Sequence, residues 1–346
     1  MFKTVKEFNV LNKRVLVRCD FNVPLDKKGN ILDDFRIKSA LLTIKYLVEN
    51  KAKIILMSHL GDPKGKKVSN LKLDNTAKRL GELLNAKITK DDDCVGPLVE
   101  SHSKSLEGGE ILLLENLRFH KEEEEGDNEF AKKLSWLGDI YVNDAFSASH
   151  RAHASIIGPP QFIPSFAGLL FLKEVENLNK ALKNPARPLV VVVGGKKAET
   201  KSKFINKISE SADLVIVSGL VKKEFIKNNI KLSHPEKIIS PGGSLEALDI
   251  DRKTAEKFEE KIMLAKTVIW NGSFGKFEQY PYSKGTRAIA NAILESGAFS
   301  VVGGGDTIEF LAKQGILEKF SHISTGGGAM LAYLAGEKMP GLEALR

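Results

Sequence analysis

Short apolar runs alternate along this chain with segments whose apolar residues recur at helical spacing, and this alternation limits the fold more than any other feature. In the first half, buried strands are predicted at 15–17, 54–57, 111–114 and 139–142. Between the first two strands, apolar residues recur at the spacing of one helix face. They are Ile37, Ala40, Leu41, Ile44, Leu47 and Val48. Strands and helices in this order predict an α/β fold with an open parallel sheet and helices on both faces.

The alternation is interrupted once and then resumes. Glycine and proline are frequent between 156 and 171, a helical segment follows at 172–182, and Asn184-Pro185 ends it. Further strands are predicted at 189–193, 214–217, 267–270 and 300–302. We therefore predict two doubly wound, Rossmann-like domains, at 1–165 and 185–334, joined by a helix and hinge at 166–184.

Composition excludes several classes of protein. The chain has 346 residues, a length that suits two domains, and 42% of them are hydrophobic, which is too many for a disordered chain. Apolar runs stay below the ~18 residues of a membrane span, and the first residues do not resemble a signal peptide. The two cysteines, Cys19 and Cys94, make neither a disulfide framework nor a zinc quartet, so we expect a cytoplasmic protein without a membrane partner.

The net charge of +8 predicts an affinity for anions. Nucleic-acid binders often combine basic clusters with aromatic side chains, whereas aromatic residues make up only 7% of this chain and no basic tail is present. Phosphorylated small molecules are therefore the favoured ligands, and a nucleic-acid partner is not expected.

In the first half, basic and polar side chains follow successive predicted strands. These residues are Arg18, Asp20, Asn22, His59, Arg118, His150 and Arg151, and Arg36 opens the first helix. Ligands of doubly wound sheets lie beyond the carboxyl ends of the strands, and the planar guanidinium suits phosphate and carboxylate. A metal site at His150 and His153 is disfavoured because no third ligand lies nearby in the sequence. The acidic run 122–125 is expected to be a solvated loop or helix start.

In the second half, three glycine clusters follow strands, at 194–195, 303–305 and 326–328. Glycine between a strand and a helix lets backbone N–H groups approach a phosphate. Lysines beside the first cluster and Asp306 beside the second point to a nucleoside triphosphate with magnesium. A P-loop is excluded because Thr200 replaces its second glycine, and a dinucleotide fingerprint because Ile308 replaces its last glycine.

Seven segments resemble the phosphoglycerate kinase family, in the family's order and over nearly the whole chain. They are RVLVRCDFNVP (14–24), LMSHLG (56–61), LLLENLRFH (112–120), YVNDAFSASHRAHAS (141–155), WNGSFGKFE (270–278), GGGDT (303–307) and STGGGA (324–329). The resemblance implies Mg-dependent, reversible phosphoryl transfer between ATP and 3-phosphoglycerate, giving 1,3-bisphosphoglycerate and ADP in glycolysis or gluconeogenesis. It also implies that residues 335–346 pack back on the first domain. We expect a monomer whose hinge closes on its ligands.

The resemblance places the site residue by residue. Substrate-binding positions match Asp20, Phe21, Asn22, Arg36, His59, Leu60, Gly61, Arg118 and Arg151. Nucleotide-binding positions match Gly195, Lys197, Lys201, Asn271, Glu278, Gly304, Gly305, Asp306 and Thr307, with Asp306 on magnesium. The residues expected to act in catalysis are Arg36, Lys197, Gly304 and Gly327.

The chain also departs from the family pattern. Asp62 stands where the family usually has arginine, Lys196 and Thr200 replace an alanine and an aspartate, and the stretch 221–249 is shortened in the nucleotide domain. Asp62 adds a negative charge beside the substrate residues, whereas the shortening at 221–249 affects base specificity and nucleotide affinity. The alternative function is that of a catalytically weak or inactive binding protein with the same fold.

Overall fold

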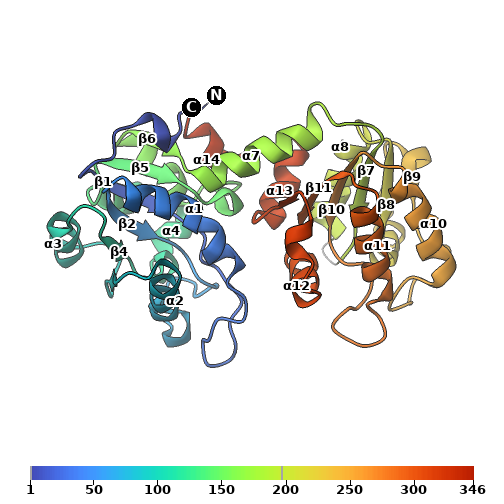
Figure 1. The fold of residues 1–346 in the computed structure, drawn as a ribbon, viewed down its shortest axis with the longest axis horizontal. Coiled ribbons are helices and arrows are strands. Elements are labelled where there is room, and N and C mark those ends of the chain that lie inside the picture. Colours follow the sequence, from blue (N-terminus) through green and yellow to red (C-terminus); the bar gives the residue numbers. More distant parts are fainter. Residues whose placement is uncertain (1, 196–197) are drawn as a thin grey trace. The chain divides into compact units, whose positions relative to one another are not determined.

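The computed structural model describes residues 2–195 and 198–346, which divide into two compact units. Unit 1 comprises Met1–Lys173 with Met339–Arg346, and unit 2 comprises Glu174–Lys338. Each unit is built on one six-stranded sheet with flanking helices, so the predicted α/β class is confirmed (Figure 1). The division falls inside helix α7 (Leu169–Leu182).

The sheet of unit 1 is entirely parallel and has the order β3-β4-β2-β1-β5-β6. Its strands are β1 (Arg14–Arg18), β2 (Lys53–Met57), β3 (Ile88–Lys90), β4 (Ile111–Leu113), β5 (Ile140–Asn143) and β6 (Ser165–Ala167). In the middle of the sheet, Leu16 of β1 lies between Ile55 of β2 and Tyr141 of β5. Strands β2 to β4 are added on one side of β1, and β5 and β6 on the other. The topological switch therefore lies between β1 and β5.

Helices flank this sheet (Figure 1). They are α1 (Phe35–Glu49), α2 (Asp74–Leu84), α3 (Pro97–Ser105), α4 (Lys121–Glu125), α5 (Asn128–Ser135), α6 (Ala154–Ile157) and the short α14 (Pro340–Glu343). Helix α1 buries Ile37, Ile44 and Leu47, the positions that the helical spacing predicts. The last residues pack on this unit, where the N–H of Gly341 donates to the carbonyl of Ser149 at 2.9 Å.

The first turn of α7 is held by side chains of unit 1. Oδ1 of Asp144 accepts the N–H of Leu170 at 3.0 Å, and Oγ1 of Thr43 accepts that of Leu169 at 2.9 Å. The N–H groups at the start of a helix have no partner within the helix, so these side chains satisfy them.

The sheet of unit 2 is also parallel and has the order β12-β11-β10-β7-β8-β9. Its strands are β7 (Leu189–Val193), β8 (Leu214–Val217), β9 (Ile238–Ile239), β10 (Thr267–Asn271), β11 (Phe299–Gly303) and β12 (His322–Ile323). Its helices are α8 (Ala198–Ser209), α9 (Gly219–Lys227), α10 (Arg252–Met263), α11 (Lys284–Glu295), α12 (Gly305–Lys313) and α13 (Gly327–Leu334). The switch lies between β7 and β10. Among the helices that the structure describes, none combines the length and apolar character that crossing a membrane requires.

Candidate active site

Asp20 organises the edge of unit 1 at the switch between β1 and β5. Its Oδ1 accepts the N–H of Asn22 at 2.9 Å, and its Oδ2 accepts the hydroxyl of Ser147, which follows β5. Arg36, in the first turn of α1, brings Nη1 to 3.2 Å from Oδ2 of Asp20. Burial alone would raise the pKa of Asp20, but several groups, the guanidinium of Arg36 first among them, with the hydrogen bonds from Ser147 and Asn22, together outweigh it and the pKa falls to about 2. Asp20 is therefore an anion that orients Arg36.

The segments that follow β1 and β2 are joined by hydrogen bonds. Oδ1 of Asn22 accepts the N–H of Gly61 at 2.8 Å, and Oγ of Ser58 accepts the N–H of Phe21 at 2.8 Å. Gly61 has a φ of +65°, and a Cβ there would lie 2.8 Å from Cδ2 of Leu71, so only glycine fits this turn. These contacts bring Asp20, Phe21, Asn22 and Gly61 into one rigid edge.

Arg118 joins the same edge from the turn η3 (Leu117–Phe119) after β4. Its Nη1 donates to the carbonyl of Gly61 at 2.7 Å, and its Nε lies 3.1 Å from a carboxylate oxygen of Glu124. Burial and the nearby Arg151 lower the pKa of Arg118. The neighbouring Leu60 is held through its N–H and its carbonyl by the side chain of Asn116.

Arg151 lies farther out on the same side of unit 1. It is exposed, and its Nε donates to Nε2 of His150 at 3.2 Å. The fields of Arg118 and Arg151 both reach His153 and lower its pKa, so these arginines share one electrostatic environment. All the substrate residues expected from the sequence thus lie at or near one edge of the sheet.

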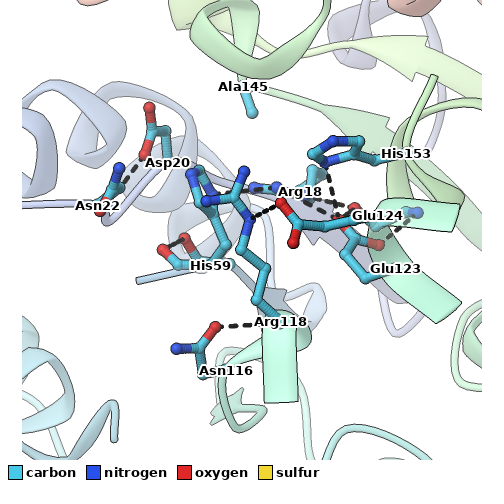
Figure 2. A network of polar contacts seen from close by, with 12 residues as sticks. Arg18, Asp20, Asn22, His59, Asn116, Arg118, Glu123, Glu124, Ala145 and His153 are labelled. Carbon is cyan, nitrogen blue, oxygen red and sulfur yellow. Dashed lines mark hydrogen bonds and ion pairs between the residues drawn. The ribbon is translucent and has the colours of Figure 1, made fainter. Parts of the chain in front are cut away.

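Behind this edge lies a buried polar network (Figure 2). Arg18, the last residue of β1, and Glu123 of α4 are both inaccessible to solvent, and Nη2 of Arg18 lies 3.7 Å from Oε1 of Glu123. Nη2 of Arg18 also lies 3.2 Å from Nδ1 of His59. The expectation that the acidic run 122–125 is solvated is therefore wrong for Glu123, because one face of the short helix α4 turns toward Arg18.

The histidines of this region are uncharged. Burial, with Arg18 and Arg118 nearby, keeps the pKa of His59 well below its ordinary value, and burial with Arg18 lowers that of His153 to about 3. Burial and Arg151 likewise lower the pKa of His150. The positive charge at the edge therefore comes from the arginines, and the histidines supply hydrogen bonds.

Among the described residues of unit 1, a separate group of side chains offers donor atoms of the kind that bind metal ions. Donor atoms of Asp93, Cys94 and His120 lie within 4.8 Å of one another. Oδ1 of Asp93 is already bonded to Nε2 of His120 at 2.6 Å, and its Oδ2 pairs with Nζ of Lys67 at 3.1 Å. Burial and the charge of Asp93 raise the pKa of the Cys94 thiol. We therefore describe the group as an ion-paired cluster beside a neutral thiol.

In unit 2, glycines bring the ends of β7 and β10 together at the topological switch. The N–H of Gly194 donates to the carbonyl of Asn271 at 2.9 Å, and that of Gly195 to the carbonyl of Ser273 at 2.7 Å. The backbones approach so closely that a Cβ on Gly194 would clash with the carbonyls of Gly272 and Ser273. Nζ of the buried Lys201 donates to the carbonyl of Gly194. Gly195 and Lys201, both expected to contact the nucleotide, thus lie at the same turn.

The start of α12 faces the same turn. Gly304 precedes the helix with a φ of +98°, and a Cβ there would lie 3.4 Å from Nδ2 of Asn271. That Nδ2 is buried and has no hydrogen-bond partner among the described residues. Thr307 is buried, and its Oγ1 accepts the N–H of Gly272 at 2.9 Å, so it supports the turn. The unsatisfied donor of Asn271 and the first N–H groups of α12 lie at one edge, an arrangement of donors that suits an anion.

A cavity of about 270 Å³ adjoins this edge. Gly195, Glu278 and Asp306 line it together. The remainder of its wall includes Phe274, which belongs to the segment 270–278, and residues outside the motifs, namely Leu220, Pro241, Ser244, Ala247, Leu248, Asp249 and Ile250. Most of these lie between β9 and α10, where the described chain forms turns and bends. No periodic pattern marks this segment, and the feature of the sequence that pointed to it is the shortening within 221–249.

Two further residues of unit 2, Gly327 and Lys197, are expected from the sequence to act in catalysis. Gly327 begins α13 with a φ of +33°, and the preceding turn is tied to the buried Glu174, whose Oε1 accepts the N–H of Thr325 at 2.6 Å. Lys197, expected to contact the phosphates, lies outside the described residues, as does Lys196.

Comparisons with known proteins agree along the whole chain. The family model described as phosphoglycerate kinase matches residues 5–235 and 229–337. The phosphoglycerate kinases of Moorella thermoacetica and Dictyoglomus turgidum are 41% and 42% identical over 388 aligned residues, covering 99% of this chain and 98% of each relative. Both alignments are longer than the 346-residue chain, so they contain gaps on its side. The two segments of the family match meet within 221–249.

Solved structures show the same likeness. The crystal structure of the phosphoglycerate kinase from Pyrococcus horikoshii OT3 has a TM-score of 0.90 and 34% identity, covering 100% of this chain and 98% of its own. For the phosphoglycerate kinase from Coxiella burnetii, the TM-score is 0.81 and the identity 33%, with 100% and 99% covered.

Proposed function

Because the chain belongs to the phosphoglycerate kinase family, we propose that it transfers a phosphoryl group reversibly between ATP and the carboxylate of 3-phosphoglycerate, giving 1,3-bisphosphoglycerate and ADP. It is thus a phosphotransferase with a carboxyl group as acceptor. The observation that carries the proposal is that each unit has an anion-binding edge at its topological switch, one rich in arginine and one built from glycine turns.

Unit 1 binds the acid substrate. Arg36, Arg118 and Arg151 supply positive charge, and Asn22 and His59 supply hydrogen bonds. The attacking group is a carboxylate that is already ionised at pH 7, so the reaction does not need a general base. Catalysis then consists mainly of positioning the reactants and neutralising the charge on the group in transfer.

Unit 2 binds the nucleotide. Gly304 and Gly305 offer backbone N–H groups at the start of α12, Gly195 lines the adjoining cavity, and Lys197 and Lys201 add positive charge. Glu278 lines the cavity at a position that suits the ribose. The N–H groups at the start of α13, that of Gly327 among them, suit the phosphoryl group in transfer.

Asp306 fits the magnesium ion that the family uses. Its exposed carboxylate lies in the first turn of α12 and lines the cavity, and Mg²⁺ prefers oxygen ligands. When bound with the nucleotide, the ion supplies charge neutralisation at the phosphates. We further propose that the chain acts as a monomer in the cytoplasm.

Initial rates with 3-phosphoglycerate and Mg²⁺, with ATP and GTP varied in turn, test the function. Saturable, Mg²⁺-dependent turnover that requires 3-phosphoglycerate is expected. A folded protein that binds both ligands in calorimetry and shows no turnover would instead be an inactive relative.

A further inference from the structure

Glu123 is a buried carboxylate behind the substrate edge of unit 1. It is inaccessible to solvent, and both of its oxygens contact Ser155: Oε1 accepts the hydroxyl at 2.7 Å and Oε2 accepts the N–H at 2.9 Å. A buried carboxylate is costly unless it is paired and hydrogen-bonded. The residue that balances its charge is Arg18, whose Nη2 lies 3.7 Å from Oε1.

His153 also lies beside Glu123 but does not supply that charge. Its Nδ1 is 3.8 Å from Oε1 of Glu123. Burial and the field of Arg18 lower the pKa of His153 to about 3, so its ring is neutral at physiological pH. The charged pair in this network is therefore Arg18 with Glu123 (Figure 2).

Three contacts of Arg18 fix the plane of its guanidinium. Nε donates to Oγ of Ser155 at 2.7 Å, Nη1 donates to the carbonyl of Cys19, and Nη2 lies 3.2 Å from Nδ1 of His59. Ser155 thus contacts the guanidinium through Nε, and Nη2 faces both Glu123 and His59.

This arrangement decides which nitrogen of His59 carries the proton. A guanidinium has only donors, so Nδ1 of His59 must accept, and a neutral ring then carries its proton on Nε2. We propose that Glu123 is a positioning residue, which holds Arg18 against Nδ1 of His59 and so keeps His59 in the Nε2–H form that donates to the anionic substrate. The last step rests on the proposed function of unit 1.

The test uses ring nitrogen NMR of the full chain, with the His59 signals assigned by their loss in His59→Gln. In the wild type, His59 is expected to be protonated on Nε2 and unprotonated on Nδ1 between pH 6 and 8. Glu123→Gln should shift the His59 ring signals and raise KM for 3-phosphoglycerate about 10-fold, with KM for ATP unchanged. Glu125→Gln, an exposed position of the same helix, is the matched control and should change neither.

Ser155→Ala provides a second variant if Glu123→Gln does not fold. It removes the acceptor of Nε of Arg18 and should shift His59 in the same direction by less. Unchanged His59 signals in the folded variants would overturn the proposal. Equal rises of both KM values with a lowered Tm would also overturn it, since they indicate a general structural role. Absence of turnover in the wild type would refute the proposed function and leave the NMR result to decide the tautomer.

Discussion

Nη1 of Arg36 lies 3.2 Å from Oδ2 of Asp20 and donates to the carbonyl oxygen of Asn22 at 2.8 Å. The helix α1 and the segment after β1 thereby hold the guanidinium in one orientation at the carboxyl edge of the sheet. This relationship explains how a half-buried arginine becomes a fixed binding group.

Arg36→Lys should lower kcat/KM for 3-phosphoglycerate by about 100-fold, because lysine is a point charge and cannot reproduce the planar fork. Arg14→Lys is the matched control. Arg14 also pairs with an aspartate, Asp139 at 2.6 Å, but it lies at the amino end of β1. Steady-state kinetics of both variants give the comparison, and equal effects would remove Arg36 from the site.

Gly304→Ala should raise KM for ATP by about 10-fold or more, because a Cβ at φ +98° strains the turn that presents the N–H groups of α12. Gly297→Ala is the matched control. Gly297 also has a positive φ, of +65°, but nothing lies within 4 Å of a Cβ built there. The control should lose stability and keep its KM for ATP. Similar KM values in the two variants would argue against a nucleotide role for this turn.

Leu248→Ser should raise KM for ATP about fivefold, since the side chain is 45% exposed in the cavity wall and a bound base would cover it. Leu264→Ser, at a position 62% exposed on no described cavity wall, should leave the KM unchanged. KM for 3-phosphoglycerate should stay constant in both. An unaltered KM for ATP in Leu248→Ser would place the base elsewhere.

Asp144→Asn should alter how stability depends on pH. Burial raises the pKa of Asp144 to about 7, whereas an unfolded aspartate titrates near ~3.9. Between these values the native state binds more protons than the unfolded state, so the contribution of Asp144 to stability falls as pH rises. Denaturant midpoints measured at pH 5 and pH 8 should therefore show that the stability of the variant relative to the wild type is higher at pH 8 than at pH 5.

Asp139→Asn serves as the control for that experiment. Although burial opposes it, the hydrogen bonds from Arg14 lower the pKa of Asp139, so its stabilising effect is complete above the unfolded pKa. The loss of stability caused by Asp139→Asn should be the same at pH 5 and pH 8. A pH-independent effect of Asp144→Asn would show that Asp144 is already ionised in the native state.

The fold and much of the substrate edge could be predicted from the sequence, because strand ends of a parallel sheet meet at one edge. Asp20, His59 and Arg118 follow three different strands and needed only that rule to be brought together. The nucleotide turns were predictable for the same reason, through the glycines after β7 and β11.

Other features could not be predicted because they depend on packing. Glu123 stands in a run of four glutamates, and only the placement of α4 against Arg18 buries it. Leu248 and Asp249 lie in a segment without periodicity, so their place in the cavity wall followed from the tertiary fold. Asp144 is a single acidic residue whose partners, Thr43 and Leu170, are distant in sequence.

The central claim is that the chain phosphorylates a carboxylate, and the product formed from ATP labelled in its γ-phosphate tests this most directly. With 3-phosphoglycerate and Mg²⁺ present, the label should appear in an acyl phosphate. In a parallel sample, hydroxylamine should convert the acyl group to a hydroxamate and release the label as inorganic phosphate. Arg36→Lys should form this product far more slowly than the wild type. Label that remains in ATP, or that appears as inorganic phosphate without formation of a hydroxamate in the parallel sample, would contradict the account.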